Sequence, residues 1–271
     1  MQIQFLDIDQ IAASGQTFRW YKVSQGYVVV HKDQGLHVTQ NKHQIKMNLL
    51  TQGTLEDWYD YLDLNRDYKS IRQSLYGKNP YLDEAMTYGE GIRVLNQDAY
   101  EMLVTFMISA NNNMKRIKES VRLLSLRYGK KIFEFENQPY YSFPTKEALK
   151  DVSVKELRAC GLGYRDKYVF ELIEALNQGL NISKFHEFTD DDLRKALMAI
   201  KGVGEKVANC VILFGYQRRN GFPIDTWIKK VLFKHFDVEE KGLQKYVENF
   251  FPYEGGLAQQ YLFYYGGVAK K

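Results

Sequence analysis

A Gly-x-Gly turn between two helix-forming segments is the feature that most constrains the fold. Residues 189–216 read TDDDLRKALMAIKGVGEKVANCVILFGY, where two apolar-periodic segments flank Gly202 and Gly204. Glycine lets the backbone turn sharply and approach a partner closely. The exposed N–H groups at the start of the second helix form a site for an anion, and a DNA phosphate is a suitable one. An ordinary tight turn between two packed helices is the alternative interpretation.

The second helix of this hairpin carries a lysine where a cation is disfavoured. Lys206 falls in the first turn, beside the positive end of the helix dipole, at a cost of a few tenths to roughly 1 kcal/mol. A neutral amine is a nucleophile and an ammonium is not, so the position suits a reactive lysine. Asp225, in FPIDTW, comes 19 residues later. It either caps the next helix or brings a carboxylate to the same cleft. A lysine pointing into water is the alternative for Lys206.

Length and composition indicate a well-packed protein. The chain has 271 residues, of which 45% are hydrophobic and 14% aromatic, enough for two domains more comfortably than one. The N-terminus lacks a basic segment followed by an apolar one, and no apolar run approaches the ~18–20 residues of a membrane span. We therefore expect a soluble protein of the cytoplasm or nucleoid.

Cysteine count and charge limit the chemistry. Cys160 and Cys210 stand fifty positions apart, so we expect no metal site, and a cluster held by four cysteines is excluded. The net charge of +4 permits nucleic acid as a partner. Residues 114–131 carry seven Lys or Arg against one Glu. This stretch is either a DNA-binding segment or a solvated helix face.

The periodicity of the chain changes near residue 90. Residues 1–90 contain β-rich runs such as GYVVVHKD and GLHVTQN, together with an amphipathic helix. Residues 91–271 are a succession of helical segments with short connections. We predict an α+β fold with an N-terminal antiparallel sheet domain. Two mainly α-helical lobes follow and carry the helix-hairpin-helix at 200–206.

The hairpin with its lysine, followed by Pro223-x-Asp225, resembles the helix-hairpin-helix DNA glycosylases that are also abasic-site lyases. Further segments resemble the 8-oxoguanine DNA glycosylase branch in the same order along the chain. They are SGQTFRW (14–20), GIRVLNQDAYEMLVTFMISANNNMKRI (91–117), LRACGLGYRDKYV (157–169) and AQQYLF (258–263). The resemblance covers nearly the whole chain, and the short N-terminal unit suggests a compact, prokaryote-like member.

The resemblance implies a base-excision repair enzyme without an organic cofactor or metal. Lys206 matches the lysine that attacks C1′ of the flipped nucleotide, forms a Schiff base and cleaves the strand by β-elimination. Asp225 matches the aspartate that stabilises positive charge on the sugar. An oxocarbenium-like state is stabilised by a nearby carboxylate, and an imine requires an amine, so the residue types fit these roles.

The resemblance also implies how the damaged base and its partner are read. Gly15 matches the residue whose carbonyl accepts the N7–H of 8-oxoguanine, a donor that guanine lacks. The residues that sandwich the purine match Cys210 and Phe263, and Gln259 matches the reader of its Watson–Crick edge. For the opposite strand, Tyr164 matches the wedge that fills the stack. Asn111, Arg116 and Arg165 match the residues that contact the unpaired cytosine. Taken singly, each has a plainer reading as a turn glycine, a core side chain, a helix cap or surface charge.

On the phosphate side, the resemblance implies contacts from Lys201, Gly202, Gly204 and Trp227. Two of these depart from the family, because Lys201 stands where proline is usual and Trp227 where many members have histidine. A monovalent cation is expected on the hairpin carbonyls when DNA is bound. The expected partner is double-stranded DNA containing 8-oxoguanine, bound by a monomer, with no membrane association.

Two other functions remain open from the sequence. A different helix-hairpin-helix glycosylase, for alkylpurines or oxidised pyrimidines, would share the fold. Alkylpurine enzymes generally lack the lysine, and the pyrimidine enzymes usually hold a four-cysteine cluster. A non-catalytic DNA-binding module is the third possibility, and it has no need for Lys206, Asp225 and the pocket residues together.

Overall fold

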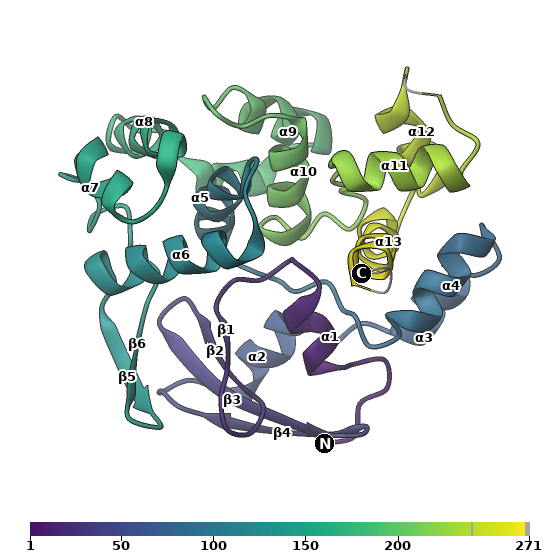
Figure 1. Cartoon of the computed structure of the whole chain (residues 1–271), viewed down its shortest axis with the longest axis horizontal. Helices are drawn as coiled ribbons and strands as arrows, with labels where there is room; N and C mark the ends of the chain where they lie inside the picture. The colour runs from purple at the N-terminus through teal and green to yellow at the C-terminus, as the bar shows by residue number, and fades with distance from the viewer. Residues whose placement is uncertain (240, 269–271) are drawn as a thin grey trace.

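The computed structural model describes residues 1–239 and 241–268 as an antiparallel sheet domain joined to a larger body of helices (Figure 1). The sheet has the order β1-β2-β3-β4. Its strands are β1 (Trp20–Lys22), β2 (Tyr27–His31), β3 (Gln34–Asn41) and β4 (Gln44–Leu49). Val29 pairs with Leu36, and Val38 with Met47. The meander is built from adjacent strands joined by short turns, and Lys32 and Lys42 in two of these turns have positive φ.

The sheet buries one face against two short helices, α1 (Ile8–Ala13) and α2 (Leu55–Tyr61). Trp20, Val29 and Leu36 pack there with Trp58 of α2. The helices begin where the sequence provides caps, since Asp7 accepts N–H bonds from α1 and Thr54 forms a capping box with Asp57. The predicted antiparallel sheet with helices is therefore confirmed.

The helical body contains the remaining helices, apart from two 3-10 turns, η1 (Gly163–Arg165) and η2 (Ile182–Glu187). They are α3 (Tyr68–Leu75), α4 (Pro80–Tyr88), α5 (Ala99–Ser109), α6 (Met114–Tyr128), α7 (Val154–Ala159), α8 (Asp166–Asn177), α9 (Asp190–Met198), α10 (Glu205–Phe214), α11 (Thr226–His235), α12 (Leu243–Phe250) and α13 (Gly255–Val268). Among the described residues, these helices share one continuous apolar core. In the described part of the chain, none is both long and apolar enough to pass through a bilayer.

The packing differs from the expected division of the chain at residue 90. Helices α3 and α4 precede that point, yet Tyr68, Leu82 and Met86 belong to the core of the helical body. Figure 1 shows α3 and α4 beside α13, far from the strands. The domain boundary after residue 90 remains a prediction. The apolar cores of the sheet domain and of the helical body separate close to residue 64.

A β-hairpin interrupts the part of the chain expected to consist of helices. Strands β5 (Lys131–Phe135) and β6 (Gln138–Tyr141) pair antiparallel between α6 and α7. Glu136 and Asn137 join them, both with positive φ, as a two-residue hairpin turn requires. The alternation in KIFEF was the signal for a strand here.

The basic stretch 114–131 does not form a single charged face. Its first residues lie at the start of α6, where Lys115 and Arg116 are exposed. Further along, Arg122 pairs with Glu119 at 2.8 Å, and burial lowers the pKa of Lys118. DNA binding by this stretch remains a prediction, and Arg127 and Lys130 near its end are exposed as well.

A buried, extended segment, residues 91–98, joins the sheet domain to α5. It has no regular structure, so its backbone groups find partners one by one. The N–H groups of Val94 and Leu95 donate to Tyr68 Oη and Gln16 Oε1, at 2.9 and 2.8 Å. The next two N–H groups donate to the carbonyls of Tyr61 and Phe214. The segment thereby binds both domains through its own backbone.

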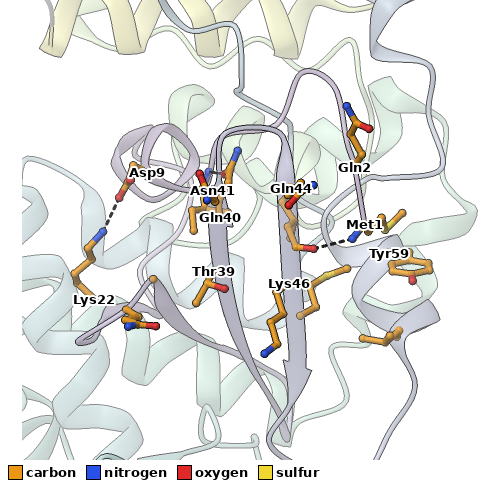
Figure 2. A pocket seen from close by; sticks show the side chains of 16 residues that line it. Met1, Gln2, Asp9, Lys22, Thr39, Gln40, Asn41, Gln44, Lys46 and Tyr59 are labelled. Carbon is orange, nitrogen blue, oxygen red and sulfur yellow. Dashed lines mark hydrogen bonds and ion pairs between the residues drawn. The ribbon is translucent and has the colours of Figure 1, made fainter.

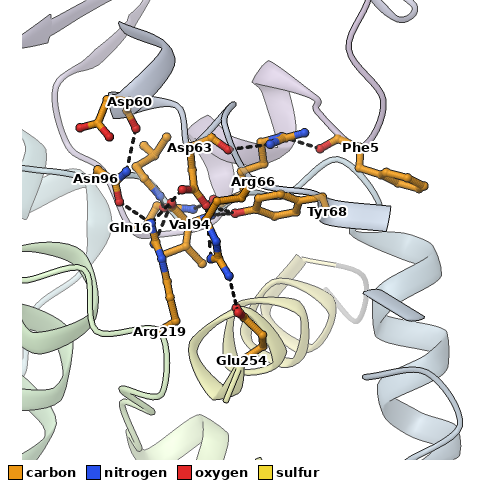
Figure 3. A network of polar contacts seen from close by, with 12 residues as sticks. Phe5, Gln16, Asp60, Asp63, Arg66, Tyr68, Val94, Asn96, Arg219 and Glu254 are labelled. Atoms are coloured by element: carbon orange, nitrogen blue, oxygen red, sulfur yellow. Dashed lines mark hydrogen bonds and ion pairs between the residues drawn. The ribbon is translucent and has the colours of Figure 1, made fainter. Parts of the chain in front are cut away.

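Charged side chains complete this junction (Figure 3). Asp63 is 4% exposed and accepts from Arg219 at 2.9 Å and from Tyr68 Oη at 2.8 Å. Arg66 lies near the same carboxylate and pairs with Glu254. Arg219 also donates to the Val94 carbonyl. The network therefore anchors the loop that leads from Arg219 to Asp225.

We expect Arg219→Met to destabilise the fold by about 2–3 kcal/mol, because it removes a partner of the buried Asp63 carboxylate. Urea unfolding monitored by tryptophan fluorescence measures this. Arg218→Met is the matched control, since its guanidinium donates to two backbone carbonyls near the surface and its loss should cost under about 1 kcal/mol. Equal effects of the two changes would contradict the anchoring role.

Candidate active site

A cavity of about 500 Å³ opens between the helical elements and the loop after α1. It is lined from five helices (α5, α6, α10, α11 and α13) and three loops that are distant in sequence. Seven of the residues singled out in the sequence line it: Gly15, Asn111, Lys206, Cys210, Asp225, Gln259 and Phe263. A larger hollow, of about 900 Å³, lies on the sheet domain between Asp9, Lys46 and Tyr59 (Figure 2) and contains none of them.

The Gly-x-Gly hairpin joins α9 to α10 as predicted. Gly202 has φ of +88°, and an added Cβ would lie 2.7 Å from the Tyr168 ring, so the position requires glycine. Gly204 is the N-cap of α10, has φ of −90°, and faces open space. Because glycine has no side chain, the first N–H groups of α10 have no side-chain cap. Uncapped N–H groups at the start of a helix are the arrangement that binds an anion.

Lys206 is the second residue of α10 and reaches into the cavity. Its Nζ lies 3.4 Å from Ser109 Oγ and 5.3 Å from the centre of the Phe106 ring. Ser109 donates its own hydroxyl proton to the Phe106 carbonyl, so its oxygen presents a lone pair to the lysine. Within residues 1–239 and 241–268, no carboxylate forms an ion pair with Lys206. The amine is therefore held by weak contacts that a substrate atom would replace readily.

Asp225 has two uses for its carboxylate. It is the N-cap of α11, and its Oδ1 accepts from the N–H groups of Trp227 and Ile228 at 3.0 and 2.7 Å. Its other oxygen takes no part in the cap, and the residue lines the same cavity as Lys206. The expected cap and the expected site carboxylate are thus the same group.

Cys210 and Phe263 form two walls of the cavity, from α10 and α13. Burial raises the pKa of the Cys210 thiol, so it stays protonated and does not compete with the amine as a nucleophile. The Phe263 ring packs against Gly15, where an added Cβ would lie 2.8 Å from Cε1. Gln259 is buried beside it and accepts from Gln260 at 2.9 Å.

The three consecutive asparagines at the cavity rim have different environments. Asn112 donates to the Ile108 carbonyl at 3.1 Å, which caps the end of α5. Asn113 accepts from the N–H of Arg116 at 3.0 Å and is the N-cap of α6. Asn111 has a left-handed backbone with φ of 47° and an exposed side chain. The helix ends thus use two of the three amides and leave Asn111 for a ligand.

Arg165 is buried and not part of the charged surface. Its Nε and Nη2 donate to the carbonyls of Ala110 and Asn111, each at 2.6 Å. The neighbouring Tyr164 is 54% exposed, and the Arg165 guanidinium lies 4.4 Å from the centre of its ring. Both residues line a second hollow, of about 360 Å³, with Gly202 and Gly204. The predicted wedge and the hairpin therefore share one face.

The other predicted contacts lie outside the cavity. Arg116 is exposed on the first turn of α6, and Lys201 pairs with Glu171 at 2.7 Å, which raises the pKa of the lysine. For Trp227 the expected phosphate contact is not supported. Its backbone N–H is bonded to Asp225, and its indole Nε1 is buried against Gly266. Neither donor is accessible, because a large ring at this position packs onto α13.

Sequence reasoning missed the residues that support the site. Phe106, Ser109 and Gln260 line the cavity, and Gln16 lies behind Gly15. Their signal was weak, because an apolar residue, a serine or a glutamine inside a helix or turn has many ordinary roles. In the described part of the chain, no group of three or more His, Cys, Asp or Glu is arranged to hold a metal.

Comparison with known proteins agrees with this geometry. The N-terminal domain of 8-oxoguanine DNA glycosylase matches residues 1–103. The solved structure of a Clostridium acetobutylicum 8-oxoguanine glycosylase/lyase, in complex with dsDNA containing cytosine opposite 8-oxoG, superposes with a TM-score of 0.93. It is 32% identical and covers 99% of this chain and 94% of its own.

Two curated relatives are less similar. A probable N-glycosylase/DNA lyase of Methanothermobacter thermautotrophicus is 28% identical over 67% of this chain, and the N-glycosylase/DNA lyase OGG1 of Arabidopsis thaliana is 28% identical over 80%. The matched regions span 64% and 63% of those proteins.

A helix-hairpin-helix with a lysine in its second helix, which lines one cavity together with a carboxylate, is typical of the helix-hairpin-helix DNA glycosylases. The family match and the superposed structure identify one branch of this class. The chain belongs to the 8-oxoguanine DNA glycosylase/lyase family.

The hairpin geometry predicts unequal effects of alanine at its two glycines. Gly202→Ala places a Cβ against Tyr168 in a left-handed backbone, so we expect a loss of about 1–3 kcal/mol in unfolding free energy and weaker binding to duplex DNA. Gly204→Ala meets open space and should cost under about 1 kcal/mol. Urea unfolding and fluorescence anisotropy measure both effects. Equal tolerance at the two positions would contradict the close approach at Gly202.

Proposed function

We propose that this protein removes 8-oxoguanine opposite cytosine from duplex DNA and then cleaves the abasic strand. The observation that carries the proposal is one cavity of about 500 Å³ whose lining includes Lys206 and Asp225 together with Gly15, Gln259, Cys210 and Phe263. The solved Clostridium relative, which binds DNA with cytosine opposite 8-oxoG, supports the same substrate.

In the proposed reaction, the Lys206 amine gives up a proton and forms a bond to C1′ of the flipped nucleotide. The bond from C1′ to the base breaks, and the base leaves with the electron pair and takes up a proton. The sugar ring then opens, O4′ becomes a hydroxyl, and C1′ and Nζ share a protonated imine. Removal of a proton from C2′ expels the 3′ phosphate and breaks the strand. The free oxygen of Asp225 stabilises the positive charge that develops on the sugar.

The lesion is distinguished from guanine by a donor at N7. In the proposal, the Gly15 carbonyl accepts this N7–H, while guanine presents an acceptor there and is repelled. The purine lies between Cys210 and Phe263, and Gln259 reads its Watson–Crick edge. Extrusion of the base costs a few kcal/mol of lost stacking, which the pocket and the wedge offset.

The opposite strand is read by the rim of the site. Tyr164 fills the gap left in the stack, and Asn111, Arg116 and Arg165 contact the unpaired cytosine. Arg165 has five N–H donors, three of which are used on carbonyls of the protein. Two remain for the cytosine O2 and N3 acceptors.

Around the site, we propose that backbone N–H groups of the hairpin at Gly202 and Gly204 bind a phosphate, with Lys201 nearby. A monovalent cation on the hairpin carbonyls, action as a monomer and a location in the cytoplasm or nucleoid remain predictions. The lysine in the cavity favours this reaction over that of alkylpurine enzymes. The two cysteines are too few for the four-cysteine cluster usual in enzymes for oxidised pyrimidines.

Borohydride trapping tests the central step. Incubation with a duplex that carries one 8-oxoguanine opposite cytosine, followed by reduction, should yield a covalent protein–DNA complex. Lys206→Gln should abolish the complex, because Lys206 is the one lysine among the described residues that lines the cavity. Lys195→Gln, on the exposed side of α9, is the matched control and should retain it. Base release without an adduct in the wild type would rule out the lyase step, and an adduct in Lys206→Gln would rule out this nucleophile.

The substitution Asp225→Asn tests the charge of this side chain separately from its role as the N-cap of α11. Asparagine is as good an N-cap as aspartate, so the unfolding free energy should change by under about 0.5 kcal/mol. The single-turnover excision rate should fall by roughly 100-fold or more, with DNA affinity nearly unchanged, because the charge that stabilises the sugar is lost. Asp67→Asn, at the same position of α3 with the same two N–H bonds, should leave the rate intact. A parallel loss of DNA binding in Asp225→Asn would mean that the residue is mainly structural.

A further inference from the structure

Gln16 lies directly behind Gly15 and is completely buried, with 0% exposure. Its side-chain amide makes three hydrogen bonds, all of 2.8 Å. Nε2 donates to Ser14 Oγ and to the Arg93 carbonyl, and Oε1 accepts from the Leu95 N–H. Because the last two partners are a backbone carbonyl and a backbone N–H, the orientation of the amide is fixed. Figure 3 shows Gln16 beside Val94 in this junction.

The backbone on both sides of Gly15 is held by the same group of bonds. Ser14 Oγ accepts from Gln16 and donates to the Ile11 carbonyl at 2.8 Å. The Gln16 carbonyl accepts from Nε2 of Gln97, also at 2.8 Å. Further along the loop, Arg19 forms a buried ion pair with Glu101 at 2.9 Å. Gly15 thus lies between Ser14 and Gln16, whose positions are fixed by hydrogen bonds in the interior.

Gly15 itself is held by no comparable bond. Among residues 1–239 and 241–268, no group donates a hydrogen bond to its carbonyl, and it lines the cavity with φ of +80°. Glycine is the most flexible residue, so the position of this carbonyl depends on its neighbours. An acceptor that selects one N–H of a base must hold its direction, and a misplacement of about 1 Å costs roughly 100-fold in rate.

We propose that Gln16 is a positioning residue for lesion specificity, which holds the Gly15 carbonyl where it accepts the N7–H of the damaged base. The inference rests on the proposed function. Gln97 assists by holding the Gln16 carbonyl. The residues act through Gly15 and do not themselves contact DNA, since Gln16 has no exposed surface and lies outside the cavity lining.

A comparison of two reactions of the same protein tests this role. Excision of 8-oxoguanine requires both Lys206 and the Gly15 carbonyl, whereas cleavage of a preformed abasic site requires Lys206 without a base to read. Gln16→Met should lower the single-turnover excision rate by roughly 10- to 100-fold. Its cleavage of the abasic duplex should stay within about twofold of wild type.

Gln40→Met is the matched control. Gln40 makes the same kind of bridge in the sheet domain, where Oε1 accepts from the Ile8 N–H and Nε2 donates to the Leu6 carbonyl, each at 2.8 Å. It contacts neither Gly15 nor the cavity lining, so both of its rates should match the wild type. Gln97→Met removes a single bond to the Gln16 backbone. It provides a milder variant with the same pattern, should Gln16→Met fail to fold.

The outcomes are distinct. A selective loss of excision in Gln16→Met or Gln97→Met, absent in Gln40→Met, supports the proposal. An equal fall of both reactions, or excision at the wild-type rate in a folded variant, overturns it, because a merely structural defect would affect Lys206 in both reactions. Wild-type protein that cleaves abasic DNA and leaves 8-oxoguanine in place would instead overturn the proposed function, and this inference with it.

Discussion

The structure depends on the hydrogen bonding of residues 91–98. A buried extended segment without a neighbouring strand must satisfy each backbone group separately, or lose the free energy of an unmade bond, about 1–3 kcal/mol for each group. The partners come from both domains: a tyrosine hydroxyl of α3, the carbonyls of Tyr61 and Phe214, and the amide of Gln16. The two cores are therefore joined by directional bonds, which set the distance and angle between them more narrowly than apolar packing would.

This junction explains how a cavity can be assembled from segments so far apart. Gly15 belongs to the loop after α1, Lys206 to α10 and Phe263 to α13. Arg219 and Glu254 connect the loop before Asp225 and the start of α13 to Asp63 and Arg66 of the sheet-domain boundary. Asp225 is the N-cap of α11, Lys206 lies in the first turn of α10, and Gly15 follows the C-terminal end of α1. The cap fixes the Asp225 carboxylate, whereas the Lys206 amine makes only weak contacts and the Gly15 carbonyl depends on its neighbours.

Much of this arrangement could be predicted from the sequence. The hairpin, the sheet and the cap at Asp225 follow from local signals, since glycine, alternation and capping residues act within a few positions. Pairings such as Arg165 with the Asn111 carbonyl could not be predicted, because they depend on the distance between helices that no local pattern determines. The same limit applies to Trp227, whose burial against Gly266 depends on how α11 crosses α13, and to the hairpin β5–β6, whose alternating run is too short to outweigh its helical surroundings.

Asp225 shows what it means for one side chain to serve two demands. One oxygen satisfies the start of α11, and the residue also lines the cavity. For folding, the position accepts any good N-cap, and asparagine, serine or threonine would serve. For the proposed reaction it accepts only a negative charge. Selection for folding and selection for the proposed reaction therefore act on the same residue, and the first allows more residue types than the second. A lineage that lost the reaction would change to other capping residues and keep its fold.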